Sequence, residues 1–134
     1  MTGTIARRNA AGLSLTHAGY YSQCVRVANP SAVLYLAGQV ARDENGANVG
    51  IGDVTRQTEQ VIANLRRALA AEGADLANLV KVTIYVIDIR DAAQIDAVRR
   101  KHFVDNLPAS TFVEVSKLNH PEWLIEIEGI AVIP

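Results

Sequence analysis

The sequence predicts an α+β domain with a mixed β-sheet and two helices on one face of that sheet. Two periodicities lead to this prediction. Short segments rich in Val and Ile alternate with a period of two, and two longer segments repeat their apolar residues every 3.6 positions. Helices interleaved with strands, after an initial hairpin, favour helices on a single face. The other face then has no cover, so we expect it to be buried by oligomerisation.

The strands are predicted from alternation and from the turn residues that bound them. Asn29-Pro30-Ser31 is typical of a turn and separates the first two strands. Between Leu79 and Ile89, Val80 and Val82 point to one face while Lys81 and Thr83 point to the other. The predicted strands span residues 22–28, 33–40, 79–89, 110–118 and 123–133.

The two helices are predicted over residues 53–72 and 91–103. Asp53 is a suitable N-cap for the first, and Gly73 is placed to end it in a left-handed conformation. Asp91 begins the second, with Gln94 three residues later as in a capping box. Residues 1–18 lack periodicity and are expected to form an N-terminal arm or loop on a single domain that spans residues 1–134.

Size and charge exclude several classes of protein. A chain of 134 residues fits one domain, since chains split only beyond roughly 250 residues. The net charge of -1 argues against nucleic acid as a partner, and no apolar run is long enough for a membrane helix. A single cysteine and no visible signal peptide lead us to expect a cytoplasmic protein.

Metal and nucleophile chemistry find little support. His17, His102 and His120 show no ligand spacing with one another or with Cys24, so we expect no metal site. Cys24 has no histidine nearby and is expected to be a buried thiol inside a strand. The glycines near position 50 form no phosphate-binding fingerprint.

Two carboxylates in the last strand are the remaining candidates for chemistry. Glu126 and Glu128 are two residues apart, so both side chains lie on one face of the sheet among aliphatic neighbours. One interpretation is a polar rim that meets solvent or a basic partner. The other is a partly buried glutamate whose raised pKa suits proton transfer. The residues alone favour neither.

The sequence resembles the Rid family, the YjgF-like reactive intermediate deaminases. The resemblance runs from about Gly19 to the C-terminus, with the family's segments in order and at nearly the usual spacing. It rests on Gly19-Tyr20-Tyr21-Ser22-Gln23, Ala37-Gly38-Gln39, Asp53-Val54, Gln57-Thr58, Asn64-Leu65, Leu79-Val80-Lys81-Val82-Thr83, Pro108-Ala109, Val113-Glu114-Val115 and Glu126-Ile127-Glu128-Gly129-Ile130-Ala131-Val132.

The resemblance implies a fold, an activity and a site. The implied fold is chorismate-mutase-like, assembled as a homotrimer through the uncovered sheet faces, with small-molecule clefts between subunits. The implied activity is hydrolysis of enamines and imines to a carbonyl compound and ammonia, without cofactor or metal. By position, Tyr21 lines the cleft, the backbone of Gly38 contacts the ligand, and Glu126 activates the attacking water.

Substrate binding is where the sequence departs from the archetype. Deaminating members carry an arginine for the substrate carboxylate at the position of Ser110, and Phe112 stands where a smaller residue is usual, so it should reshape the pocket. Asp96 replaces a common helix asparagine. Three functions stay open: an imine deaminase with altered substrate range, a non-catalytic metabolite-binding trimer, or an endoribonuclease or translation inhibitor. A replacement anchor could come from a neighbouring subunit, with Arg7, Arg8 and Arg26 as candidates.

Overall fold

The computed structural model describes residues 1–15 and 19–134. Its strands are β1 (Thr4–Arg8), β2 (Cys24–Ala28), β3 (Ala32–Gln39), β4 (Leu79–Val86), β5 (Ala109–Glu114) and β6 (Ile125–Ile133), its helices are α1 (Val54–Ala70) and α2 (Ala92–His102), and two short 3-10 turns are η1 (Leu76–Asn78) and η2 (Ile89–Asp91). The predicted α+β class is confirmed.

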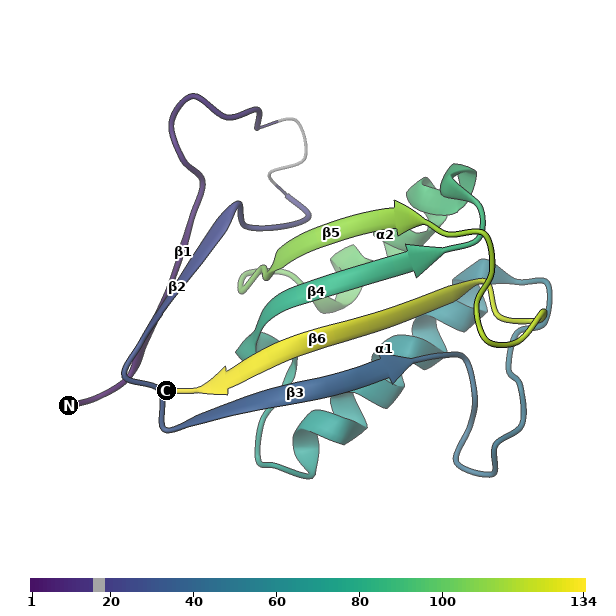
Figure 1. The fold of residues 1–134 in the computed structure, drawn as a ribbon, viewed down its shortest axis with the longest axis horizontal. Coiled ribbons are helices and arrows are strands. Elements are labelled where there is room, and N and C mark those ends of the chain that lie inside the picture. The colour runs from purple at the N-terminus through teal and green to yellow at the C-terminus, as the bar shows by residue number, and fades with distance from the viewer. Residues whose placement is uncertain (16–18) are drawn as a thin grey trace.

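A four-stranded mixed sheet forms the centre of the molecule, in the order β3-β6-β4-β5. Strand β6 pairs antiparallel with β3 and β4, while β4 and β5 run parallel. Both helices lie behind this sheet in Figure 1, as predicted. The core between the two layers is aliphatic, and its fully buried large side chains include Ile62, Leu65, Leu69, Leu79, Ile84, Ile95 and Ile125.

Local signals fix the ends of α1 more clearly than those of α2. The Asp53 side chain accepts a hydrogen bond from the backbone N–H of Arg56 at 3.1 Å, which confirms the predicted N-cap. Gly73 adopts φ 72° just beyond the helix, as predicted. Asp91 makes no side-chain capping bond, so the predicted capping box is wrong. The turn η2 precedes α2 instead, and the Asp88 side chain caps that turn.

The N-terminal segment departs from the sequence-based expectation. Residues Thr4–Arg8, expected to be loop, form β1 and pair antiparallel with β2 in a separate two-stranded ribbon. Figure 1 shows this ribbon beyond one end of the central sheet. The predicted hairpin of the first two strands is therefore wrong, because β2 pairs with β1 and β3 pairs with β6. Between β2 and β3, Asn29 has φ 50° and Pro30 follows it, so the chain turns away from β2.

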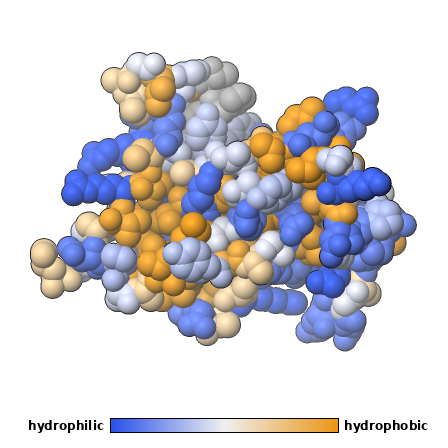
Figure 2. Space-filling view, in the orientation of Figure 1, coloured by the Kyte–Doolittle hydropathy of each residue, from blue (hydrophilic) through white to orange (hydrophobic). Residues whose placement is uncertain are grey.

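The face of the central sheet opposite the helices has no cover within the described part of the chain. We call this the open face. It carries Tyr35, which is 81% exposed, and Val33, which is 45% exposed. Figure 2 shows apolar residues gathered over this side of the molecule. Lys81, Tyr85 and Glu126 point to the same face, because their strand neighbours are buried against the helices.

Candidate functional site

The structure separates the predicted site residues into two hollows. Gly38 and Glu126 line a cavity of about 290 Å³ on the open face. Tyr21, Ser110 and Phe112 line another of about 360 Å³ between β5 and α2. We call these the glutamate hollow and the helix-side hollow. The register explains the division: Glu126 lies beside Tyr85, which faces outward, whereas Phe112 lies beside Ile84, which is fully buried against the helices.

The glutamate hollow depends on the missing side chain at Gly38. The ladder between β3 and β6 is irregular between Leu36 and Gln39, and this irregularity brings Gly38 beside Glu126. A Cβ atom on Gly38 would overlap Oε1 of Glu126 and would lie 2.9 Å from its Cδ. Position 38 must therefore be glycine if the Glu126 carboxyl group is to keep this place.

Electrostatics in the glutamate hollow favour a protonatable Glu126. Partial burial raises the pKa of Glu126, and the neighbouring charge of Glu128 raises it further. Glu128 accepts a hydrogen bond from the Tyr85 hydroxyl group, and this bond is the main reason that the pKa of Tyr85 is raised. The two carboxyl groups thus have different surroundings, and Glu126 is the one suited to carry a proton.

A buried glutamine, whose role the sequence did not reveal, positions the start of β6. Gln57 on α1 is fully buried. Its Nε2 donates to the carbonyl oxygens of Gly50 at 3.1 Å and Glu122 at 2.9 Å, and its Oε1 accepts from the Leu124 N–H at 2.8 Å. These bonds tie the segment that leads into Glu126 to the helix layer. The resemblance includes Gln57, but nothing in its spacing indicates this contact.

The helix-side hollow combines an apolar wall with one ion pair. Tyr21, Phe112 and Ile89 line it together with Ala92. Phe112 also packs against the hydrophobic core. That its ring reshapes the pocket stays a prediction. The hollow opens beside β5, which is an edge strand of the central sheet.

Arg99 is the unexpected member of this hollow. Its side chain is only 6% exposed, and its Nη1 donates to Oδ1 of Asp96 at 3.0 Å. Its Nη2 donates to Ser110 Oγ at 3.2 Å and to the Tyr20 carbonyl oxygen at 3.3 Å. Burial lowers the pKa of Arg99, and the charge of Asp96 opposes that change. A guanidinium group thus lies at Ser110, supplied by α2 of the same chain.

The three arginines suggested as a replacement anchor lie elsewhere. Arg7 donates to the carbonyl oxygens of Ala77 at 2.9 Å and Leu79 at 3.2 Å, which fixes the ribbon to the central sheet. Arg8 and Arg26 belong to the same ribbon, in β1 and β2. None of the three lines either hollow.

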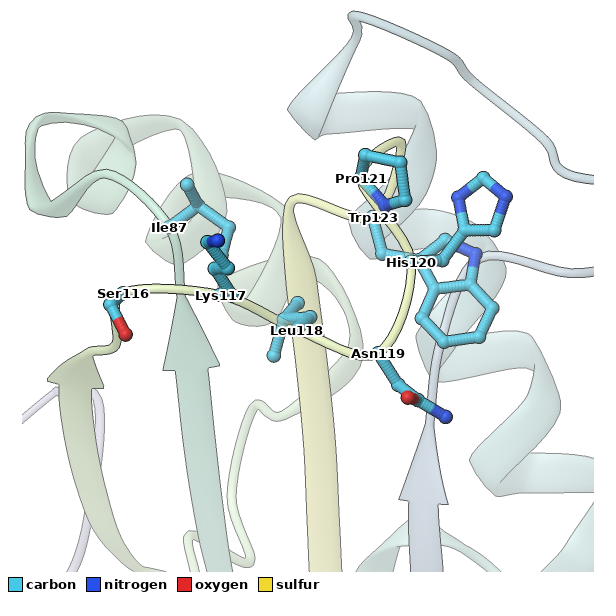
Figure 3. A pocket seen from close by; sticks show the side chains of 8 residues that line it. All are labelled: Ile87, Ser116, Lys117, Leu118, Asn119, His120, Pro121 and Trp123. Carbon is cyan, nitrogen blue, oxygen red and sulfur yellow. The ribbon is translucent and has the colours of Figure 1, made fainter.

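A further cavity of about 420 Å³ adjoins the glutamate hollow, and the two share Lys117 and Leu118. Figure 3 shows its lining on the loop between β5 and β6, with Ile87 at the end of β4. The His120 and Trp123 rings have centroids 5.3 Å apart. The described residues that line this cavity include no carboxylate.

Other site types find no support among the described residues. Within 1–15 and 19–134, no group of three His, Cys, Asp or Glu residues could hold a metal ion. His17 lies outside those residues. Cys24, expected to be buried, is exposed on β2, so that expectation is wrong. No helix in the described part of the chain could span a membrane.

Two helices on one face of this mixed sheet make the chorismate-mutase-like fold of the Rid proteins. The sequence model described as Endoribonuclease L-PSP matches residues 12–133, and the chain belongs to that family. The resemblance read from the sequence is thereby confirmed.

Individual relatives agree with this assignment. A RutC family protein from Pyrococcus abyssi is 39% identical over 113 residues, which are 84% of this chain and 86% of that protein. The 2-iminobutanoate/2-iminopropanoate deaminase of Rattus norvegicus is 35% identical over 85% of this chain and 80% of its own. The crystal structure of YyfB, a Rid family protein of unknown function from Yersinia pestis, superposes with a TM-score of 0.88 at 32% identity, over 96% of this chain and 98% of that one.

Proposed function

We propose that this chain hydrolyses imines and their enamine tautomers to a carbonyl compound and ammonia. The observation that carries the proposal is the Glu126 carboxyl group, which lies in a hollow against Gly38 with its pKa raised by burial and by Glu128. The named activity of the deaminase from Rattus norvegicus supports the same reaction class.

The reaction needs one proton carrier and one water molecule. As the water oxygen bonds to the C=N carbon, the π electrons of the C=N bond move onto the nitrogen, and Glu126 takes one proton from the water and passes it to that nitrogen, which gives a carbinolamine. Glu126 then takes the hydroxyl proton of the carbinolamine and passes it to the nitrogen as the C–N bond breaks and the C=O bond forms. Imine and water therefore give ketone and ammonia, with no oxidation or reduction. A carboxyl group whose pKa is raised toward the working pH performs both transfers efficiently.

A second copy of the chain completes the cleft in this proposal. The glutamate hollow and the helix-side hollow face different sides of the sheet in one chain, so a single ligand does not reach both. The open face exposes Tyr35 and Val33, and burying such a patch favours association of identical chains. The edge strand β5 would present the helix-side hollow to the open face of a neighbour, in a closed homotrimer.

The test measures ammonia release from a series of freshly generated small imines that differ in their side chains. We expect turnover above the rate in water, and a loss of about 100- to 10,000-fold in Glu126→Gln, as for removal of a general acid–base group. The matched control is Glu122→Gln, which removes an exposed carboxylate four residues away. Saturable ligand binding without any turnover would contradict the hydrolase and leave a metabolite-binding protein.

Co-expression of two inactive variants tests the shared cleft. Glu126→Gln disables the glutamate hollow, and Ser110→Trp fills the helix-side hollow. In randomly mixed trimers, about one quarter of the clefts would pair an intact hollow of each kind, so about one quarter of wild-type activity should return. If the mixture stays inactive although mixed assemblies form, the cleft is not shared between copies.

A further inference from the structure

Among the described residues that line it, the helix-side hollow offers no unpaired positive charge to a ligand. Arg99 is the cation in its lining, and Asp96, in the same lining, offsets that charge at 3.0 Å. The Nη2 atom of Arg99 also donates hydrogen bonds to Ser110 Oγ and to the Tyr20 carbonyl oxygen. Arg100 lies over the Tyr20 ring, 4.6 Å from its centroid, and does not line the hollow.

The glutamate hollow holds more acidic than basic side chains. Its lining contains one cation, Lys117, and two carboxyl groups, Glu126 and Glu128. A cleft built from both hollows would therefore hold more acidic than basic side chains. A substrate carboxylate held in the helix-side hollow would have no unpaired cation of the described residues beside it, and it would have to leave water to bind there.

What the helix-side hollow does offer is one donor beside one acceptor. Ser110 Oγ accepts from Arg99, so the proton of the Ser110 hydroxyl group is available for an acceptor in the hollow. Asp96 is 23% exposed and uses Oδ1 for Arg99, which leaves its other oxygen as an acceptor. A carboxamide has both complements, a carbonyl oxygen and N–H donors. A carboxylate has only acceptors.

We infer that the Arg99–Asp96 pair makes Asp96 a specificity-determining residue, which directs the cleft to imines with an uncharged amide-type head and away from 2-imino acids. The inference rests on the proposed function for the reaction at the C=N bond. The matched substrates are the enamines 2-aminoacrylamide and 2-aminoacrylate. They differ only in that the first carries a carboxamide where the second carries a carboxylate. Addition of water would give ammonia with pyruvamide from the first and with pyruvate from the second.

Binding of the two stable ketone products tests the inference without requiring turnover. Calorimetric titration of the wild-type chain should show pyruvamide binding at least about 10-fold more tightly than pyruvate, the lower end of what a charge-assisted hydrogen bond contributes. A chain that binds pyruvate equally or more tightly, or that binds neither ketone, overturns the inference.

Removing the compensating charge should reverse the preference. Asp96→Asn keeps an oxygen acceptor for Arg99 but leaves its positive charge unbalanced, so pyruvate affinity should rise about 10- to 150-fold. Asp105→Asn is the matched control, because it removes an exposed carboxylate on the loop after α2 and should change neither affinity. Unchanged pyruvate affinity in folded Asp96→Asn overturns the inference.

A double variant keeps the test decisive if Asp96→Asn is too unstable to titrate. Asp96→Asn combined with Arg99→Gln replaces both charged side chains with uncharged amides. This variant should keep the wild-type preference for pyruvamide. A preference for pyruvate in this variant contradicts the charge argument. The two proposals fail separately: turnover of 2-aminoacrylate in preference to its amide overturns only the specificity, whereas amide-selective binding without any turnover overturns only the hydrolase.

Discussion

Replacing Gly38 with alanine adds one methyl group at the point where the glutamate hollow is tightest. The new Cβ would overlap Oε1 of Glu126 and would lie 2.9 Å from Cδ and 3.0 Å from Cγ. Real Cβ atoms do not approach other carbons this closely, so the whole end of the Glu126 side chain must move. The φ angle of Gly38 is not positive, so the backbone itself accepts alanine without strain.

The expected cost falls on activity far more than on stability. Glu126 can leave the clash by rotating its side chain, and an unfavourable rotamer costs about 0.5–1.5 kcal/mol. That loss corresponds to a fall of a few degrees in Tm for a domain of this size. In the proposed reaction, moving the Glu126 carboxyl group away removes the proton carrier, so we expect kcat to fall about 100- to 10,000-fold.

The assay compares kcat for ammonia release with the Tm of the same preparations. A second arm measures Gly38→Ala in a Glu126→Ala background, where the side chain that the methyl group displaces is absent. There the alanine should cost no further stability, because its effect acts through Glu126. Wild-type activity in Gly38→Ala would refute the assigned position of the carboxyl group, and an undiminished stability loss in the Glu126→Ala background would refute the clash.

Three other changes test separate parts of the structure. Glu126→Gln should raise Tm near neutral pH: the raised pKa of Glu126 favours the folded state below its ordinary value of 4.5 and penalises it as the pH rises. When Tm is measured against pH, the difference between Glu126→Gln and the wild-type chain should therefore grow from about pH 4 upward. A difference that does not change with pH would contradict the burial argument. Gln57→Ala should lower the free energy of unfolding in urea by about 3 kcal/mol, because it leaves one buried and two partly buried backbone groups unpaired. Tyr35→Glu should reduce the mass measured by light scattering to that of one chain, and an unchanged mass would remove the open face as the contact.

Periodicity predicted the central layers because burial there follows a simple rule. In β4 and β6, alternate residues are buried against the helices, so the pattern in the sequence mirrors the pattern in the structure. Strand β1 escaped prediction because its burial pattern has no such alternation and its partner is β2. Pairing of β3 with β6 joins residues about a hundred positions apart, and local sequence carries no information on that choice.

From the sequence we could name the candidate residues that belong to segments typical of the family. We could not name a residue whose place in the candidate site depends on tertiary contacts. Gly38 and Glu126 belong to segments that resemble the family, and the structure brings them together. Arg99 was missed because it begins the run Arg99-Arg100-Lys101-His102, which reads as a solvated helix end. The contacts of Arg99 with Ser110 and with the Tyr20 carbonyl group depend on the tertiary fold, so its burial is not visible in the local sequence.

Exclusion of water from the open face would affect both association of copies and the pKa of Glu126. Burial of the exposed Tyr35 and Val33 side chains would favour association, and Glu126 lies on the face that association would cover. In a single chain the pKa of Glu126 is already raised by partial burial. A second copy placed over the hollow would exclude more water, and the loss of water acts in the same direction on a carboxyl group. The proton carrier would therefore be tuned closer to neutral pH in the assembly than in the isolated chain, so we expect activity per chain to fall when the assembly dissociates.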